Sequence, residues 1–378
     1  MENPGWRNLM PRGLFAHFSN QAGTEVGNGP NALTVRMQLL RLIEIAKGIS
    51  TVFALAVILV WVSHTVTFQH LAESIHNQYA TVRGEPFIYD GKPLVIHPFY
   101  NRIIFPIVFT FLTTALHGWT DVQIFLGLRF LSFLLCLGAI YIAVHRRSYS
   151  SANSALIACS VLALSMVPTF THLWVHTSDI FDLTFSFFIF LYLAEGRLLP
   201  AFLVACLTAV NRETGAFAGV FYLCIAFGQQ KTQSVVVRAV AFTLVPYLGA
   251  VLVRKLVLGH ALPLGSSGQW YTGFSHNFAI LLATLKRPSP IGWPSLLFAM
   301  LVLPWLVFVS QKTAANFKLR VALAFIAVFT ITAAVGINAE TRTFIPCVAL
   351  LIACAVAIPE SSDLTHLSSL AARRHVEA

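Results

Sequence analysis

The chain contains a series of long apolar runs, and the first of them most strongly limits what it can fold into. Residues 49–68 form 20 consecutive positions without Asp, Glu, Lys or Arg. A helix of about 20 apolar residues is long enough to cross the hydrocarbon core of a bilayer. Only 11% of the whole chain is charged, whereas a typical soluble domain is about 25% charged. The sequence therefore predicts an all-α, polytopic transmembrane helix bundle.

Further apolar runs set the expected number of spans. They lie at 122–144, 153–171, 183–194, 239–258, 292–310, 321–337 and 343–358. Residues 198–228 could form one long span or two short spans hinged at Asn211–Thr214. The hinge is favoured because charged residues such as Arg212 and Glu213 are costly in the middle of a span. With the hinge, the chain has ten spans.

Basic residues give the expected orientation in the membrane. Arg36, Arg41 and Lys47 precede the first span, and Lys and Arg mark the cytoplasmic side. This rule also accounts for the net charge of +10 without a nucleic-acid partner. The absence of Asn-x-Ser/Thr sites disfavours a glycosylated eukaryotic protein, and a bacterial inner membrane is the expected location. The expected regions are a partly disordered cytoplasmic tail (1–48), a transmembrane domain (49–358) and a second cytoplasmic tail (359–378).

The loop after the first span is long and rich in titratable groups. It covers residues 69–121, is expected outside, and includes a short apolar run at 103–118. This run contains Pro106 and is short for a span, so we expect a helix lying at the membrane interface. A functional site and a surface loop held by ordinary ion pairs remain equally open for the charged part of the loop.

Charged residues gather at the outer ends of the expected spans. The acids expected there are Glu73, Glu85, Asp90, Asp121, Asp179, Asp182, Glu213 and Glu340. Lipid contact penalises charges at such positions. We therefore expect these residues to line one cavity that opens outward.

Four arginines are also expected at these outer ends. They are candidates for binding a phosphate, because guanidinium groups make paired hydrogen bonds to anionic oxygens. They are Arg102, Arg129, Arg212 and Arg342. The alternative is that each arginine neutralises a nearby acid, for example Glu213 beside Arg212. In the hinged arrangement, Arg212 and Glu213 are expected to be partners at the outer surface.

Two short motifs have the spacing of metal ligands. Asp179 and Asp182 are three residues apart and could hold a divalent cation, the one cofactor that the residue pattern suggests. A helix cap and a first-turn acid are the favoured alternative for this pair. His172 and His176 share a helical face, but no glutamate follows the first histidine as in HExxH, so zinc is disfavoured. The six cysteines lie in apolar runs and fit small core residues.

The order of several weak motifs resembles the GT-C superfamily of membrane glycosyltransferases, especially the protein O-mannosyltransferase and aminoarabinose transferase-like branch. The long outer loop closes with HPFY at 97–100, and the apolar run after it ends in HGW at 117–119. A span then opens with LGLRFLSF at 126–133, and AETRTFIP at 339–346 leads into the last apolar run. The similarity covers most of residues 50–358.

The resemblance implies a GT-C-like helical fold and a polyprenyl-phosphate sugar donor used at the extracytoplasmic face. In that family an acid early in the first outer loop, usually in an Asp-Glu pair, is the catalytic base. Here the corresponding segment has only Glu73, and Asp90 lies later in the loop. Glu73 and Asp90 are therefore the expected catalytic residues. The expected substrate-binding residues are Glu85, His97, Arg102, Arg129, His176, Asp179, Asp182, Arg212, Glu213 and Arg342.

Two other functions stay open at this point. A glycolipid or solute transporter (flippase) also places charges within spans, although its halves often repeat and its sites often lie near the membrane midplane. A catalytically silent membrane protein of envelope assembly would explain the missing Asp-Glu pair. Loss of activity on replacing Glu73 by Gln would distinguish an enzyme from a scaffold.

Overall fold

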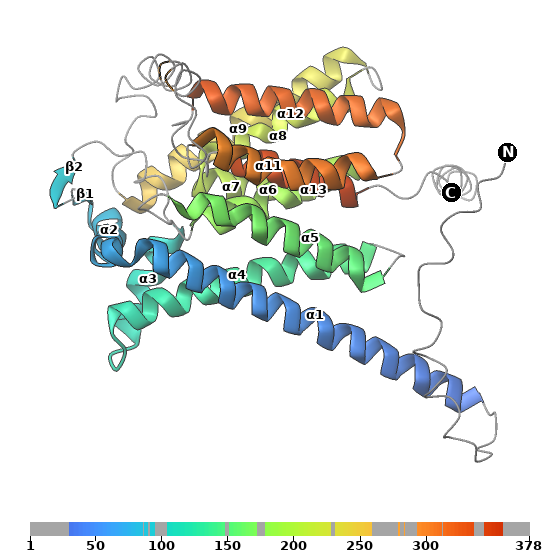
Figure 1. Cartoon of the computed structure of the whole chain (residues 1–378). Helices are drawn as coiled ribbons and strands as arrows, with labels where there is room; N and C mark the ends of the chain where they lie inside the picture. Colours follow the sequence, from blue (N-terminus) through green and yellow to red (C-terminus); the bar gives the residue numbers. More distant parts are fainter. Residues whose placement is uncertain are drawn as a thin grey trace. The chain divides into compact units, whose positions relative to one another are not determined.

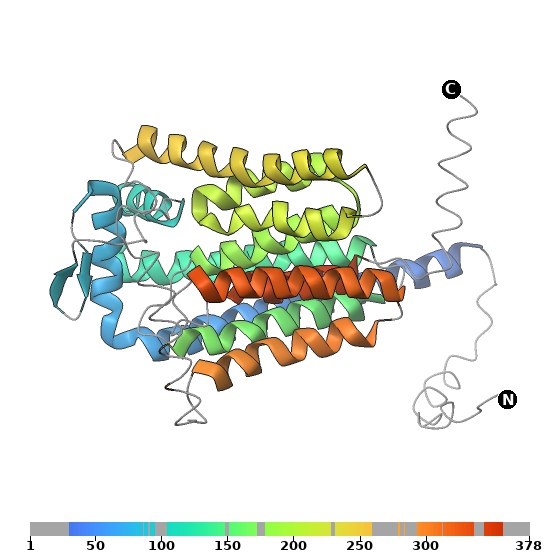
Figure 2. The ribbon, with the colours of Figure 1, turned by 90° about the horizontal axis from the view of Figure 1, so that it is seen from above.

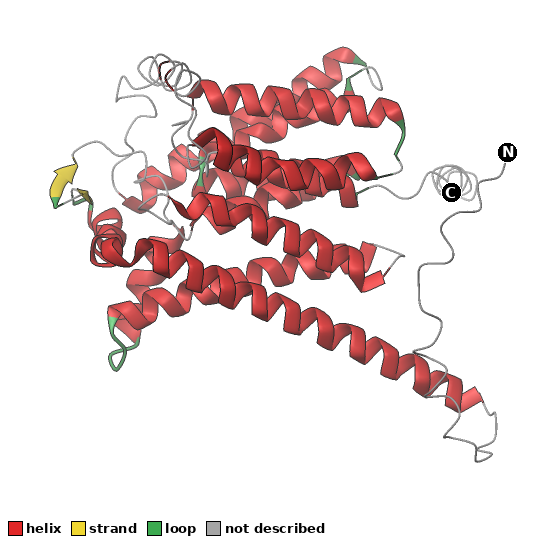
Figure 3. Ribbon diagram, viewed as in Figure 1, coloured by secondary structure: helices red, strands yellow, loops and turns green. Residues whose placement is uncertain are grey.

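The fold is taken from a computed structural model of the chain. It describes residues 30–85, 87–89, 91–94, 104–147, 151–171, 178–227, 231–258, 279, 283, 293–311, 313–335 and 344–357. The chain divides into two units, Met1–Lys47 and Gly48–Ala378. The described part of the first unit is helical. Everything else below concerns the second unit, which is built of helices and one short hairpin (Figure 3).

The first helix is longer than the first apolar run. α1 extends over Pro30–Thr67, so residues 36–48, which were expected in the cytoplasmic tail, are helical. Proline fits the first turn of a helix because its missing N–H would have no partner there. The boundary between the two units falls inside α1, after Lys47.

The long outer loop contains regular structure. η1 (Phe68–His70) continues α1 and leads to α2 (Leu71–Arg83). α2 ends at Gly84, whose φ of 69° and N–H bond to the Ala80 carbonyl are typical of a glycine helix cap. A two-stranded antiparallel hairpin, β1 (Phe87–Tyr89) and β2 (Lys92–Leu94), follows. The all-α expectation missed this hairpin.

After the hairpin, all described elements are helices. They are α3 (Ile104–Ala115), α4 (Asp121–Arg147), α5 (Ser151–Met166), η3 (Val167–Thr171), α6 (Ser178–Ala194), α7 (Leu198–Asn211), η4 (Glu213–Ala216), α8 (Phe217–Ala226), α9 (Thr232–Leu258), α11 (Trp293–Ser310), α12 (Ala315–Val335) and α13 (Ile345–Val356). From α4 onward, the long helices run back and forth side by side (Figure 1). α3 matches the short helix expected at 103–118.

Two predictions about helix boundaries have different outcomes. The break at Asn211–Thr214 is confirmed, because α7 ends at Asn211 and η4 separates it from α8. The predicted start of a span at residue 183 is wrong, because α6 begins at Ser178. Asp179 and Asp182 were expected in the outer loop but lie inside α6. Because both residues are charged, they fall outside the apolar run that predicts the span. Their burial is explained by their contacts with Arg212, described below.

α13 lies at the centre of the bundle. All of its residues from Ile345 to Ala355 are buried, and it packs against α5, α6, α11 and α12. A helix that is apolar on every side needs protein or lipid around it on every side. The last apolar run is therefore the core helix of the fold.

The outside of the bundle is apolar as well. On α7, Leu199, Leu203 and Leu207 are 69%, 56% and 53% exposed, whereas Ala201 and Ala205 on the same helix are fully buried. A water-soluble bundle shows the opposite pattern. Five helices among the described residues are long and apolar enough to cross a membrane. The protein is therefore embedded in a membrane.

One end of the Gly48–Ala378 unit carries most of the described polar contacts. In both Figure 1 and Figure 2, α2, α3 and the hairpin lie at this end, which we call the hairpin end. A small apolar cluster holds α2, α3 and the start of α4 together: Leu71 and Ile75 of α2 pack with Phe105 and Phe109 of α3, and with Phe125 of α4. The start of α6 also reaches this cluster, through Phe181.

Candidate functional site

Three buried charged residues at the hairpin end form one ion-pair cluster. Nη1 of Arg212 lies 3.3 Å from Oδ1 of Asp179 and 3.2 Å from Oδ2 of Asp182. Arg212 is 9% exposed, Asp179 is 3% exposed, and Asp182 is fully buried. The Thr214 hydroxyl donates a hydrogen bond to the other carboxylate oxygen of Asp182. Buried charges need such partners because leaving water is costly.

The break between α7 and α8 puts Arg212 in this place. Its backbone is extended (φ −160°, ψ 153°) between the end of α7 and η4, and its side chain reaches Asp179 and Asp182 of α6. The preceding Asn211 donates from Nδ2 to the Ser178 carbonyl at 3.1 Å, so the end of α7 is fastened to the start of α6. The break after α7 therefore reverses the chain and also holds α7 against α6.

The expected pair of Arg212 and Glu213 stays a prediction, but the expected position of Arg212 at the outer surface is wrong. Arg212 is buried, and its partners Asp179 and Asp182 come from α6, about thirty positions earlier in the chain. The side chain of Glu213 lies outside the described residues. One cation between two carboxylates leaves the three groups with a net charge of −1, so a donor phosphate would compete with two acids already in contact.

Asp179 and Asp182 share a helical face, as their spacing predicted. Asp179 is in the first turn of α6, where the helix dipole favours an acid, and Asp182 follows one turn later. Both carboxylates contact Arg212. Within the described residues, no three His, Cys, Asp or Glu side chains form a group that could hold a metal ion.

A close contact fixes the hinge and gives a first prediction. A methyl group added to Gly215 of η4 would stand 2.6 Å from the Ala205 carbonyl oxygen and 2.9 Å from the Ala209 nitrogen. Both atoms are helix backbone, so Gly215→Ala should destabilise the fold by about 1 to 3 kcal/mol, as overpacking does. Gly249→Ala is the control, because no atom lies within 4 Å of the new group. Denaturation in detergent micelles measures both. If Gly215→Ala and Gly249→Ala have equal stabilities, η4 can shift away from α7 without cost.

Glu73, the expected base, sits on α2 and contacts the hairpin. Its Oε1 accepts a hydrogen bond from the Gly91 N–H at 3.1 Å, and Nδ1 of His70 lies 3.2 Å from its Oε2. The side chain keeps 21% of its surface exposed. Two polar neighbours thus hold the carboxylate in one orientation while leaving it accessible.

Asn77, one turn after Glu73, also holds the hairpin. Its Nδ2 donates to the Ile88 carbonyl at 3.1 Å, and its Oδ1 accepts from the Ile88 N–H at 3.0 Å. The amide thus pairs with a strand residue much as a neighbouring strand would. The sequence reading missed Asn77, and it missed the hairpin although Asp90-Gly91 between short apolar segments is a strong hairpin signal. Gly91 has the required positive φ, 71°.

Arg129 is buried between two helices. Its Nη1 lies 3.4 Å from Oγ of Ser63 and 3.5 Å from Oγ1 of Thr67, both on α1. The guanidinium carbon is 4.8 Å from the centre of the Phe125 ring, a favourable cation–π distance. Arg129 is only 1% exposed, so in this structure it ties α4 to α1. Ser63 and Thr67 carried no signal in the sequence because isolated hydroxyl residues are common in membrane helices.

The remaining predicted residues divide into two groups. Glu85 is near the surface after α2 and lies 4.0 Å from Arg83, with both side chains about half exposed. Asp90, His97, Arg102, His172, His176, Glu340 and Arg342 lie outside the described residues. The structure therefore brings together Asp179, Asp182 and Arg212, and it places Glu73 and Arg129 at the same end of the bundle.

No family model matches the sequence, and no curated protein or solved structure does. The class of this protein therefore follows from its fold and surface. It is a membrane-embedded helical bundle with a buried ion-pair cluster at one end.

Proposed function

We propose that this protein is a membrane glycosyltransferase that takes a sugar from a polyprenyl-phosphate donor at the extracytoplasmic face. Its product would be a cell-surface glycan or glycolipid. The observation that carries the proposal is the position of Glu73. The acid that the GT-C resemblance implies as base is partly exposed and is held by two polar neighbours. Its helix α2 lies at the hairpin end (Figure 1), and Phe181, next to Asp182 on α6, packs against the apolar cluster that includes Ile75 of α2.

The proposal includes a topology. α1, α4 to α9 and α11 to α13 are the ten spans, the hairpin end is extracytoplasmic, and both chain ends are cytoplasmic. The alternating direction of the helices supports this scheme (Figure 1). So does the position of Lys231, Lys318 and Arg320 near the ends of α9 and α12 that lie away from the hairpin. Five of these ten helices, α5, α6, α7, α8 and α13, have only 10 to 17 residues. Such helices still fit where surrounding protein covers their ends.

Cysteine labelling tests this topology. Ala72 is exposed on α2 and Ala314 is exposed before α12, so each accepts a cysteine in a background whose native cysteines are replaced by alanine. An impermeant maleimide should label Ala72→Cys in intact cells and Ala314→Cys only after lysis. The reverse result would invert the scheme and place the Glu73 site in the cytoplasm. Ser74 is unsuitable as a probe because it is buried.

The proposed chemistry assigns different tasks to the charged groups. Glu73 takes the proton of the acceptor hydroxyl, which requires a carboxylate within hydrogen-bond reach. Asp90 is the second candidate for this step. The donor phosphate needs cations as its charge develops, and Arg102 and Arg342 are proposed for this role. Arg212, already shared by two carboxylates, positions α6 and α7 around the site. A divalent cation bound to the donor phosphate would add to this stabilisation, and the chelator test below decides whether one takes part.

The direct test is sugar transfer by the purified protein in liposomes. A panel of labelled polyprenyl-phosphate sugars is supplied with and without a chelator, and transfer to lipid or peptide acceptors is measured. Turnover of one donor supports the proposal, and sensitivity to the chelator assigns the cation. If no donor is consumed but a glycolipid or solute crosses the liposome membrane, the protein is a transporter. If neither occurs, a silent role in envelope assembly replaces the proposal.

A further inference from the structure

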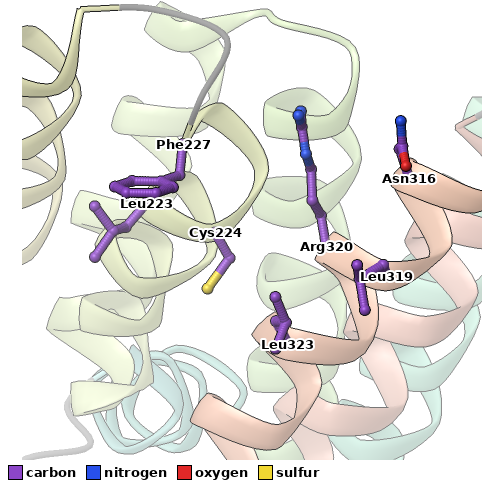
Figure 4. Close-up of a pocket in the computed structure, with 7 residues that line it drawn as sticks. All are labelled: Leu223, Cys224, Phe227, Asn316, Leu319, Arg320 and Leu323. Carbon is purple, nitrogen blue, oxygen red and sulfur yellow. The ribbon is translucent and has the colours of Figure 1, made fainter.

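A pocket lies at the end of the bundle opposite the hairpin. It has a volume of about 560 Å³ and is formed by the last turns of α8 and the first turns of α12. This volume is typical of pockets that hold a small molecule or part of a lipid. Figure 4 shows Leu223, Cys224 and Phe227 on one side, and Leu319, Arg320 and Leu323 on the other.

Most of the pocket is apolar and open to the outside of the bundle. Leu223, Leu319 and Leu323 are 37%, 61% and 51% exposed, and they belong to an outer surface that is apolar as a whole. In a membrane-embedded protein, such a surface faces lipid chains. A groove between two of these helices therefore offers room for an acyl chain.

The pocket also has a polar end. In Figure 4 the guanidinium of Arg320 and the amide of Asn316 lie at one end, and Leu323 lies toward the other. Nη1 of Arg320 donates to the Ile225 carbonyl at 3.1 Å, which caps the last turn of α8. This bond uses one of the five N–H groups that a guanidinium carries. The pocket is thus amphipathic, with a cation at its polar end.

The surroundings of Arg320 are mainly basic. Lys231 and Arg238 of the α9 segment and Lys318 of α12 lie at the same end of the bundle. Arg238 donates to the Tyr222 hydroxyl, and Lys318 donates to the Val309 carbonyl. Glu195 is also at this end, 3.7 Å from Arg197. The excess of positive charge favours an anionic head group over a zwitterionic one.

We propose that this pocket binds an anionic glycerophospholipid of the surrounding membrane. One acyl chain lies along Leu223, Leu319 and Leu323, and the phosphate is bound by Arg320 and Asn316. Basic pockets between membrane helices select such head groups. This site is separate from the proposed glycosyltransferase site at the hairpin end, and its occupancy does not depend on that function.

Native mass spectrometry of the full chain in detergent tests the site. Phosphatidylglycerol is titrated against phosphatidylcholine with the same acyl chains, and wild type should prefer the anionic lipid. Arg320→Gln keeps a side-chain N–H donor but lacks the charge, so its affinity for phosphatidylglycerol should fall by about fivefold, as expected for one basic group near the surface. Lys318→Gln removes a charge from the same helix outside the pocket and should lower this affinity by less than Arg320→Gln does. Leu323→Trp fills the apolar end and should weaken both lipids.

Four outcomes would overturn the proposal. One is equal binding of the two lipids to wild type, and another is an equal loss in Arg320→Gln and Lys318→Gln, which would indicate general surface attraction. Unchanged binding in Leu323→Trp would mean that the acyl chain does not lie in this pocket. This variant keeps the bond between Arg320 and the Ile225 carbonyl, so it still tests the site if Arg320→Gln fails to fold. In a competition arm, displacement of phosphatidylglycerol by an equal amount of polyprenyl phosphate would assign the pocket to the polyprenyl lipid instead.

Discussion

Replacing Arg212 by alanine should lower the free energy of unfolding by about 3 to 5 kcal/mol, which is typical of a buried ion pair that loses one partner. The cation lies between Asp179 and Asp182, at 3.3 and 3.2 Å. Without it, the two buried carboxylates, three positions apart on α6, would lose the cation that contacts both of them, and their mutual repulsion would be less well balanced. Chemical denaturation in detergent micelles measures the loss.

Two variants give this experiment its controls. Arg197→Ala removes an exposed partner of Glu195, where Arg197 keeps 52% of its surface, and should cost less than about 1 kcal/mol. Adding Asp179→Asn and Asp182→Asn to Arg212→Ala should recover part of the lost stability, because the repelling charges are gone. If the triple variant is no more stable than the single one, the two carboxylates are not what Arg212 stabilises. A ligand-binding role for Arg212 would then be favoured.

The second large effect concerns activity. Glu73→Gln should reduce sugar transfer by about 10²- to 10⁴-fold, the usual contribution of a general base, with little change in stability. Glutamine keeps a side-chain oxygen that can accept the Gly91 N–H, so the hairpin contact is preserved. Initial transfer rates are compared at equal folded yield in liposomes that contain the active donor.

Glu85→Gln is the matched control for this substitution. It removes an acid from the same outer segment, but Glu85 is about half exposed and its described partner is Arg83. Because Glu85 is an expected binding residue and not the base, this substitution should lower the transfer rate much less than Glu73→Gln does. Asp90→Asn tests the second candidate base in the same assay. If Glu73→Gln transfers sugar at the wild-type rate and Asp90→Asn does not, the base is Asp90, and Glu73 serves to hold the hairpin.

The sequence predicted those features that depend on local composition. The break near Arg212 followed from the cost of charges in an apolar run, and the helices from α4 onward followed from the runs themselves. The partners of Arg212 could not be found in this way, because they lie on another helix and only the packing of α6 against α7 brings them close. For the same reason the sequence predicts a start at residue 183, whereas α6 begins at Ser178. Asp179 and Asp182 resemble loop residues until their partner Arg212 is known.

At the Glu73 site, too, the sequence predicted the residue but not its contacts. Its acid was identified by position in the chain, but the contacts to His70 and Gly91 depend on a helix and a hairpin that an apolar-run analysis does not detect. Asp90-Gly91 did carry a local turn signal. Arg129 was selected for its charge alone, and its contacts with Ser63 and Thr67 depend on how α1 crosses α4.

The central position of α13 has a consequence for biosynthesis. A ribosome makes the chain from its N-terminus, so α13 is the last of the described helices to enter the membrane, yet it occupies the middle of the bundle. The helices made before it must leave its place open to lipid, or close over it and reopen. Assembly of the bundle therefore ends when α13 enters between helices that are already in the membrane, and α6 can make its contacts with α13 only at that step.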